Sequence, residues 1–428
     1  MTQRIEVPAL ARVEGEGGMY IRIKDGKVDE IRVDIYEPPR FFEGFLRGRY
    51  LQEVPDITAR ICGICPVAYQ MSSVYALEKA LGYTITPSVR NLRRLLYCGE
   101  YIESHALHIY MLQAPDLLKV DSVFQIAEIA PEVVKDALRL KKIGNQILSV
   151  IGGRSVHPVS ACVGGFYSFP KANALREMLP DLKWGLEKSK ETVRWAMTLD
   201  YPEMEVDYEF VALHHPTEYA IIEGEILSSK RGITPIDKFE EIYPEQQVRH
   251  SNAIHSRTID GEPYIVGPLA RLNLNAEQLG AEAQAILAEV GLELPLTNPY
   301  KSLIARAIEM VDAYDLAIQL VESYNPQGLS RPDLKLKAGS GAAGTEAPRG
   351  LLYHRYSIDE QGFIQDACII PPTAQNLARM EADLWKLAPD VIDLPLEEAS
   401  LACEHLIRSY DPCISCATHF LKLTIEGK

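Results

Sequence analysis

The sequence lacks an excess of basic residues. It contains 44 Lys and Arg against 59 Asp and Glu, which gives a formal net charge of −15. Nucleic acids and anionic membranes attract basic surfaces, so neither is an expected partner. Aromatic residues are also few, at 8%, but hydrophobic residues reach 47%. This composition is typical of a folded globular protein and excludes a disordered or fibrous chain.

Long hydrophobic runs are missing as well. The most apolar helical stretch, residues 92–114, contains Glu100, Glu103, His105 and His108. It therefore falls short of the roughly 20 apolar residues that span a bilayer. The first twenty residues contain acidic residues and glycines and lack the apolar core of a signal peptide. We therefore expect a cytoplasmic protein without a membrane partner.

The pattern of apolar residues predicts a mainly α-helical protein with small β-hairpins, an α+β fold. Residues 19–36 alternate around the turn Asp25-Gly26, and residues 351–370 form a second such pair around 359–362. Apolar residues at helical spacing predict the helices. These segments are 67–81, 87–114, 131–151, 171–198, 276–291, 299–324, 374–388 and 396–409.

The length of 428 residues would by itself suggest about three domains. However, the sequence contains no flexible linker, and this favours a single domain over residues 1–428. Residues 203–268 interrupt the helical pattern with short β-like runs and prolines. We expect an irregular, β-containing lobe there.

Four of the eight cysteines lie in two C-x-x-C motifs, Cys62 to Cys65 and Cys413 to Cys416. Two intervening residues let both thiolates face one ion, and four thiolates suit zinc, an iron-sulfur cluster or a late transition metal such as nickel. Zinc ribbons close over tens of residues, whereas 347 residues separate Cys65 from Cys413. A joint site would therefore lie where the two ends of a large fold meet. Each motif alone could equally be a buried pair, a redox dithiol or half of a zinc site.

The residues around both motifs resolve this ambiguity. Arg60-Ile61-Cys62-Gly63-Ile64-Cys65 and Asp411-Pro412-Cys413-Ile414-Ser415-Cys416-Ala417-Thr418-His419 resemble the two metal-binding motifs of the large subunit of nickel-iron hydrogenases. The similarity extends along the whole chain. It includes RVEG at 12–15, RFFEGFLRGR at 40–49, ESHALHIYMLQAPD at 103–116, VRHSNAIHS at 248–256, TEAPRG at 345–350 and PPTAQN at 371–376.

The resemblance implies a bimetallic centre. Cys62 and Cys413 would be terminal nickel ligands. Cys65 and Cys416 would bridge nickel to an iron that carries carbon monoxide and cyanide. Thr373 would hydrogen-bond a cyanide, and the same resemblance gives a place in this cofactor pocket to Pro348. Glu43 and His419 would bind a magnesium or iron ion near the C-terminus.

The resemblance also implies a path for protons. Heterolytic cleavage of dihydrogen needs an electrophilic metal beside a base that accepts the proton. Cys413 would be that base and Glu14 would relay the proton onward, although Glu14 alone would pass for an ordinary surface carboxylate. Arg349 would lie over the open metal position, flanked by Asp116 and Asp411.

One glycine motif competes with this interpretation. Residues Gly339 to Gly344 match the letters G-x-G-x-x-G of a dinucleotide fingerprint, but Pro348 follows and no βαβ unit surrounds the motif. We therefore expect a flexible loop that delivers Arg349 to the metal. A nicotinamide nucleotide would then be bound by another subunit.

The sequence departs from the family pattern in two places. Tyr69 stands where many members carry a histidine near the bridging sulfurs. Residues 420–428 follow His419 and resemble the tail that a maturation protease removes after metal insertion. His105 and His108 are predicted to be structural, and His250 and His255 receive no role.

Together these features predict the catalytic subunit of a nickel-iron hydrogenase that interconverts dihydrogen with protons and electrons. The remaining cysteines form no iron-sulfur array, so electrons must leave through an iron-sulfur small subunit. The sequence of this chain most resembles the NAD(P)-linked hydrogenases and sulfhydrogenases. This resemblance implies diaphorase-type flavin/NAD(P) subunits and metal-insertion proteins as partners. The alternatives are a deazaflavin or heterodisulfide reductase acceptor, a hydrogen sensor, a complex I-like scaffold or a four-cysteine structural zinc protein. The unassigned cysteines are Cys98, Cys162, Cys368 and Cys403.

Overall fold

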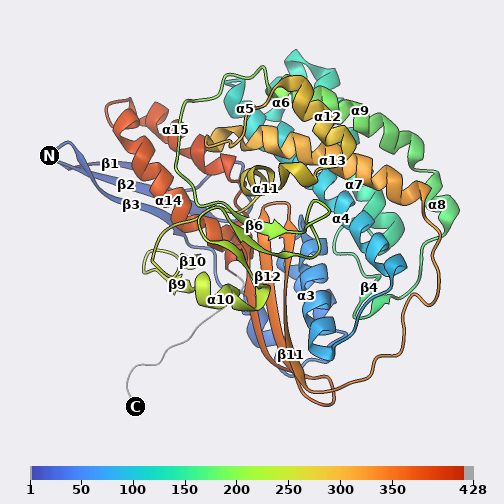
Figure 1. Cartoon of the computed structure of the whole chain (residues 1–428). Coiled ribbons are helices and arrows are strands. Elements are labelled where there is room, and N and C mark those ends of the chain that lie inside the picture. Colours follow the sequence, from blue (N-terminus) through green and yellow to red (C-terminus); the bar gives the residue numbers. More distant parts are fainter. Residues whose placement is uncertain (1, 419–428) are drawn as a thin grey trace, which may run out of the picture.

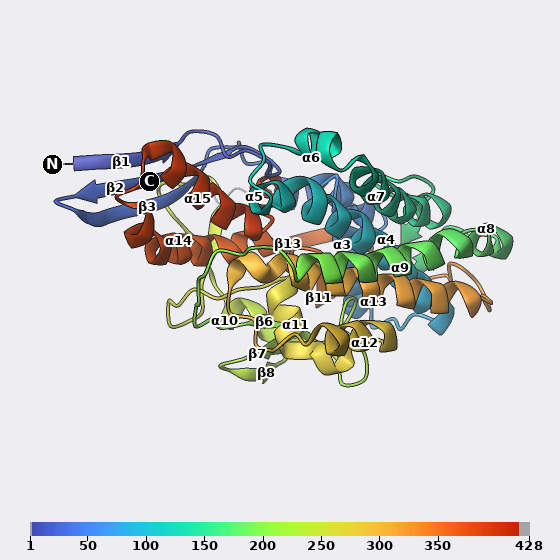
Figure 2. The ribbon, with the colours of Figure 1, turned by 90° about the horizontal axis from the view of Figure 1, so that it is seen from above.

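Four long helices form the main helical layer of the protein. The computed structural model describes residues 2–418, and in it these helices run along one another (Figures 1 and 2). The four helices are α4 (Pro87–Leu107), α7 (Pro131–Gly152), α9 (Leu179–Ala196) and α13 (Ser302–Glu322). Helix α13 is almost entirely buried, so it forms the core of the layer.

A three-stranded antiparallel sheet lies against helix α3 (Pro66–Leu81). Its strands are β11 (Gly339–Ala347), β12 (Gly350–Ile358) and β13 (Ile364–Ile370), so the predicted hairpin over 351–370 is confirmed.

The prediction of a flexible loop at 339–344 is wrong, because these residues belong to β11. A Cβ at Gly341 would overlap the carbonyl oxygen of Ala76 in α3. The glycines therefore let the helix lie directly on the strand, which is a packing role and not a phosphate-binding one.

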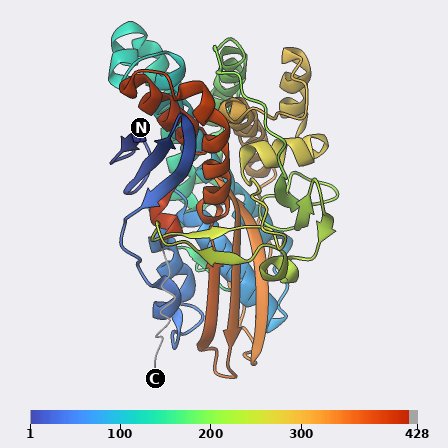
Figure 3. The ribbon, with the colours of Figure 1, turned by 90° about the vertical axis from the view of Figure 1, so that its left-hand side faces the viewer.

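A second sheet lies at the N-terminal end. It contains β1 (Thr2–Val7), β2 (Gly17–Lys24) and β3 (Lys27–Ile35), and the predicted hairpin around Asp25-Gly26 is confirmed. The sheet lies beside helices α14 (Pro372–Val391) and α15 (Leu396–Ser409), as the blue strands and red helices show in Figure 3. The two ends of the chain therefore meet on one side of the molecule.

The segment 203–268 holds only short elements. They are β6 (Val211–His214), β7 (Glu225–Ser228), β8 (Gly232–Thr234), α10 (Phe239–Ile242), β9 (Glu245–Gln247) and β10 (Ile254–Ser256). A small cluster of buried side chains, which includes Leu213, Phe239 and Tyr353, joins this segment to the β11–β13 sheet.

The predicted helices are present, with shifted ends, and the mainly helical fold with small hairpins is confirmed. The stretch predicted over 87–114 ends as α4 at Leu107 and continues as a wider turn over His108–Gln113. Among the described helices, none is both long and apolar enough to cross a bilayer. The remaining elements are α1 (Phe42–Leu46), α2 (Val54–Thr58), α5 (Ala114–Leu117), α6 (Val123–Ile129), β4 (Ala161–Cys162), β5 (Gly165–Phe166), α8 (Ala172–Arg176), α11 (Pro268–Asn275), α12 (Ala281–Val290) and α16 (Ile414–Ala417).

Candidate metal centre

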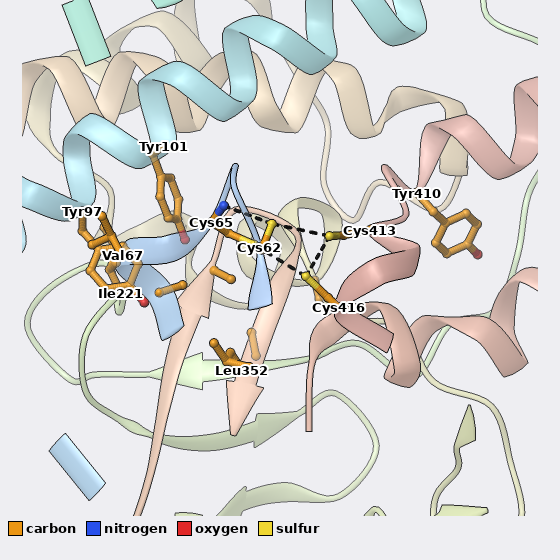
Figure 4. Close-up of a cluster of buried hydrophobic side chains, with 14 of the residues drawn as sticks. Cys62, Cys65, Val67, Tyr97, Tyr101, Ile221, Leu352, Tyr410, Cys413 and Cys416 are labelled. Atoms are coloured by element: carbon orange, nitrogen blue, oxygen red, sulfur yellow. Dashed lines mark hydrogen bonds between the residues drawn. The ribbon is translucent and has the colours of Figure 1, made fainter. Parts of the chain in front are cut away.

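The two C-x-x-C motifs meet in the interior. Cys65 immediately precedes α3, and Cys413 immediately precedes α16, so both motifs sit where a loop turns into a helix. The sulfurs of Cys62 and Cys413 lie 3.6 Å apart, those of Cys65 and Cys416 lie 3.8 Å apart, and those of Cys413 and Cys416 lie 2.7 Å apart (Figure 4). All four sulfurs fall within 4.8 Å of one another and all four residues are buried.

Backbone and hydroxyl groups orient the cysteines. The backbone N–H groups of Ile64 and Cys65 donate to the Cys62 sulfur, each at 3.3 Å, so this sulfur can carry a negative charge. On the other side, the backbone N–H of Cys413 donates to Thr373 Oγ1 at 2.9 Å. Thr373 lies in the first turn of α14, so that helix fixes the C-terminal motif.

The four thiols cannot all ionise without a cation. Hydrogen bonding from Cys413 and the other cysteines lowers the pKa of the Cys62 thiol, whereas burial raises the pKa of the Cys413 and Cys416 thiols. Ionisation of the Cys62 thiol is therefore favoured, whereas the Cys413 and Cys416 thiols need a nearby positive charge before they ionise. Because four converging sulfurs form a soft donor set, they fit a late transition metal.

Glu14 reaches this cluster from the N-terminal segment. Glu14 and Cys413 form an isolated parallel β-bridge, and the backbone N–H of Ile414 donates to the Glu14 carbonyl at 2.9 Å. The Cys413 thiol donates to Glu14 Oε2 at 3.0 Å. Gly15 permits this approach, because its φ is +90° and a Cβ there would lie 2.7 Å from the Cβ of Ile414.

A second carboxylate lies beyond Glu14. The Ser415 backbone N–H donates to Glu14 Oε2 at 3.1 Å, and its hydroxyl donates to Glu37 Oε2 at 3.0 Å. Glu37 is partly exposed. The residues Cys413, Glu14, Ser415 and Glu37 therefore form a polar series from the sulfur cluster toward the surface. No motif in the sequence singles out Glu37.

Arg349 is held beside the cysteines by Asp411. Its Nε donates to the Asp411 carbonyl at 2.7 Å and its Nη2 donates to Asp411 Oδ1 at 3.0 Å. Burial disfavours the charge, but Asp411 and the cysteine sulfurs outweigh it and keep the pKa of Arg349 above its usual value. Within residues 2–418, Arg349 Nη1 and Asp411 Oδ2 are buried without a hydrogen-bond partner. These free polar atoms fit a pocket that holds polar ligands.

Arg271, which sequence reasoning missed, positions the turn that carries Arg349. It is fully buried in α11 and forms ion pairs with Glu309 at 2.6 Å and Glu346 at 2.9 Å. It also donates to the carbonyl of Pro348 at 2.8 Å. A charged residue within the apolar run PLARL is a weak sequence signal, because exposed arginines occur in similar runs.

Asp116 has partners other than the predicted one. Its Oδ2 accepts from Arg408 Nε at 2.8 Å, and its Oδ1 accepts from Arg12. Burial raises the pKa of Asp116, but these arginines outweigh this effect and hold the pKa below its usual value. No hydrogen bond or ion pair among the described residues joins it to Arg349. Asp116 therefore orders Arg408 and Arg12, and its expected place beside Arg349 stays a prediction.

The predicted second metal site is only partly described. Glu43 accepts a hydrogen bond from the backbone N–H of Ile369 at 2.7 Å. His419 lies outside the described residues. His105 and His108 face separate partners, because His105 Nε2 lies 3.0 Å from Glu309 and His108 Nε2 lies 2.9 Å from the Arg408 carbonyl. Their predicted structural role agrees with these contacts.

Tyr69, which stands where many family members carry a histidine, lies next to the cysteines. It is fully buried, and its ring lies 5.7 Å from that of His354. Burial, together with the charges of Cys416 and Cys65, raises the pKa of its phenol. The phenol is therefore protonated, and its buried hydroxyl has no hydrogen-bond partner among residues 2–418, so a donor is available near Cys416.

Comparisons with known proteins agree with this geometry. A family model described as nickel-dependent hydrogenase matches residues 40–136 and 218–419. Sulfhydrogenase 1 subunit alpha of Pyrococcus furiosus is 34% identical over 98% of this chain and 98% of that protein. Sulfhydrogenase 2 subunit alpha of the same organism is 36% identical over 98% of this chain and 100% of its own length.

A solved structure of an NAD⁺-reducing [NiFe]-hydrogenase in the H₂-reduced state has the same fold. It superposes with a TM-score of 0.87 at 25% identity, over 97% of this chain and 99% of the other. The chain therefore belongs to the nickel-dependent hydrogenase family, as a large subunit, and is an oxidoreductase that acts on H₂.

Proposed function

We propose that the four cysteines bind a nickel-iron centre. Cys62 and Cys413 would hold the nickel, and Cys65 and Cys416 would hold both the nickel and an iron that would carry carbon monoxide and cyanide ligands. When bound, this centre supplies the electrophilic metals that polarise H₂. The convergence of four buried sulfurs is the observation that carries the proposal.

The protein residues around the centre handle the proton. The Cys413 sulfur accepts it and transfers it to Glu14 Oε2, which lies 3.0 Å away. This distance lies within the range in which direct proton transfer occurs. From Glu14 the proton leaves toward Glu37, which is partly exposed. Ser415 holds the two carboxylates near each other, because its backbone N–H donates to Glu14 and its hydroxyl donates to Glu37.

Other residues shape the pocket. Arg349, fixed by Asp411, lies near the cysteines and keeps its Nη1 without a partner among residues 2–418, and Thr373 and Pro348 contribute to the pocket of the iron ligands. Glu43 and His419 bind a magnesium or iron ion, and a maturation protease removes residues 420–428 once the metals are inserted. Glu43 accepts a hydrogen bond from the Ile369 backbone N–H in β13, which fixes the position of one proposed ligand carboxylate.

Electrons leave through an iron-sulfur small subunit to diaphorase-type flavin/NAD(P) subunits in the cytoplasm. The sulfhydrogenase relatives and the NAD⁺-reducing structure support this assignment. Purification of the native complex with its associated subunits tests it. We expect H₂-dependent reduction of NAD⁺ or NADP⁺ at a rate comparable to that with an artificial viologen. Viologen reduction without NAD(P)⁺ reduction would indicate a deazaflavin or heterodisulfide reductase acceptor.

Substitution of Tyr69 by Phe tests the surroundings of the bridging sulfurs. The Tyr69 hydroxyl lies near Cys416 and is free to donate to a thiolate there, so its removal should make the Cys416 sulfur more electron-rich and increase electron donation to the iron. We expect the carbon monoxide and cyanide infrared bands to move to lower wavenumber while the nickel content stays unchanged. Tyr75→Phe, a buried tyrosine that contacts Arg93 instead, is the matched control. Unchanged bands in Tyr69→Phe would contradict a role for its hydroxyl.

A further inference from the structure

A second group of metal-ligand side chains lies apart from the four cysteines. His255 lies in β10, His250 lies in the turn between β9 and β10, and Glu381 lies in the middle of α14. One donor atom from each falls within 4.8 Å of the others. Two separate parts of the chain, the β9–β10 hairpin and α14, therefore place two imidazoles and a carboxylate close together.

His255 is not satisfied by protein partners. It is fully buried, and both of its ring nitrogens lack a hydrogen-bond partner among residues 2–418. Its Nδ1 points to Glu381 but lies 3.8 Å from Oε2, which is too long for a hydrogen bond. Burying a polar group without a partner is costly, so a buried imidazole in this state calls for a ligand.

Hydrogen bonds hold Glu381 and His250 close to His255. Glu381 Oε1 accepts from the backbone N–H of Val33 at 3.0 Å and lies 2.8 Å from His250 Nε2. Its second oxygen therefore stays available on the side of His255.

We propose that His250, His255 and Glu381 bind one zinc ion. Two imidazoles and one carboxylate are a common zinc ligand set, and water completes the tetrahedron. The His250 side chain is 21% exposed, so solvent reaches the site from that side. Magnesium and calcium prefer all-oxygen ligands and do not fit this donor set.

A comparable group elsewhere does not satisfy the same requirements. His215, Glu218 and Glu223 are also close together, but they are partly exposed. Both carboxylates there already form ion pairs with Arg90. The negative charge that would attract a cation is thus already compensated.

The zinc would act as a structural clamp. It would tie the β9–β10 turn to α14 at Glu381, and Glu381 is bonded to β3 through Val33. Thr373, which accepts the Cys413 N–H, lies eight residues earlier on the same helix, or about 12 Å along its axis. Zinc would therefore brace the helix that orients the C-terminal cysteines, without touching the reacting atoms.

The test uses the nickel-loaded protein after incubation with zinc chloride and removal of free metal. We expect about one zinc per chain beyond the nickel and iron, and an anomalous diffraction peak at the zinc edge between the three side chains. His255→Gln and Glu381→Gln should each lose this zinc and keep their nickel. His215→Gln, which alters the other His/Glu group, should retain it.

Three results would overturn the proposal. The first is a wild-type crystal with no anomalous zinc peak at His255, which is independent of whether any variant folds. The second is an unchanged zinc content in folded His255→Gln. Zinc bound at the four cysteines alone would also count against it, because the diffraction map separates the two positions.

Discussion

Substitution of Glu14 by Gln should lower H₂ oxidation by about 100- to 10,000-fold, the usual contribution of a positioned acid-base group. Glutamine keeps the shape of the side chain and can still accept the N–H of Ser415, but it cannot take a proton from the Cys413 sulfur 3.0 Å away. Nickel content and infrared bands should be unchanged. H₂-dependent viologen reduction and exchange of D₂ with water protons measure the loss.

Glu16→Gln is the matched control. Glu16 lies two residues further along, is exposed, and has no hydrogen bond to the cysteines among the described contacts. We expect it to retain the activity of the unmodified protein. If Glu14→Gln keeps full activity and full D₂ exchange, protons leave by another route and the proposed series through Ser415 and Glu37 is wrong.

Substitution of Arg271 by Met should destabilise the protein by about 3–5 kcal/mol, the usual cost of removing one partner from a buried ion pair. Arg271 is the guanidinium that faces both Glu309 and Glu346 inside the protein. Without it, two buried carboxylates lose their counter-charge. Burial already raises the pKa of Glu346 to about 7, so this residue would take up a proton, whereas Glu309 would remain poorly compensated.

The midpoint of urea unfolding measures the effect of Arg271→Met. Arg194→Met is the control, because Arg194 and Glu289 form an ion pair on the surface, where solvent screens the charges, and little change is expected. Activity in Arg271→Met should fall as well, since Arg271 also donates to the Pro348 carbonyl next to Arg349. An unchanged unfolding midpoint would contradict the role of Arg271 as the shared counter-charge.

Local features of the fold could be predicted from the sequence. The hairpin around Asp25-Gly26 and the helix that became α13 follow from alternation and helical spacing over many residues. The glycine-rich segment at 339–344 was mistaken for a loop. Its glycines reflect contact with α3, a helix more than 250 residues away in sequence, and no local pattern encodes such a contact.

The metal centre was only partly predictable. The two C-x-x-C motifs are visible in the sequence, but their convergence depends on both chain ends meeting, and the family resemblance supplied that information. The resemblance did not give the true partners of Asp116, which are Arg408 and Arg12. Likewise, Arg271 and Glu37 have no motif, because their roles depend on contacts made only in the folded protein.

The histidines of the proposed zinc site show the same limit. His250 and His255 have four residues between them, a spacing that also occurs between zinc-binding histidines, but two histidines without a third ligand predict no site. Their relation to Glu381, more than 120 residues later, appears only when α14 lies beside β10.

Metal analysis with infrared spectroscopy on mature protein from its native host tests the central claim most directly. The account predicts about one nickel per chain and the stretching bands of iron-bound carbon monoxide and cyanide. X-ray absorption at the nickel edge should show sulfur ligands, as four cysteines require. Absence of nickel and of these bands, with zinc held by Cys62, Cys65, Cys413 and Cys416, would contradict the catalytic assignment and leave a structural site in its place.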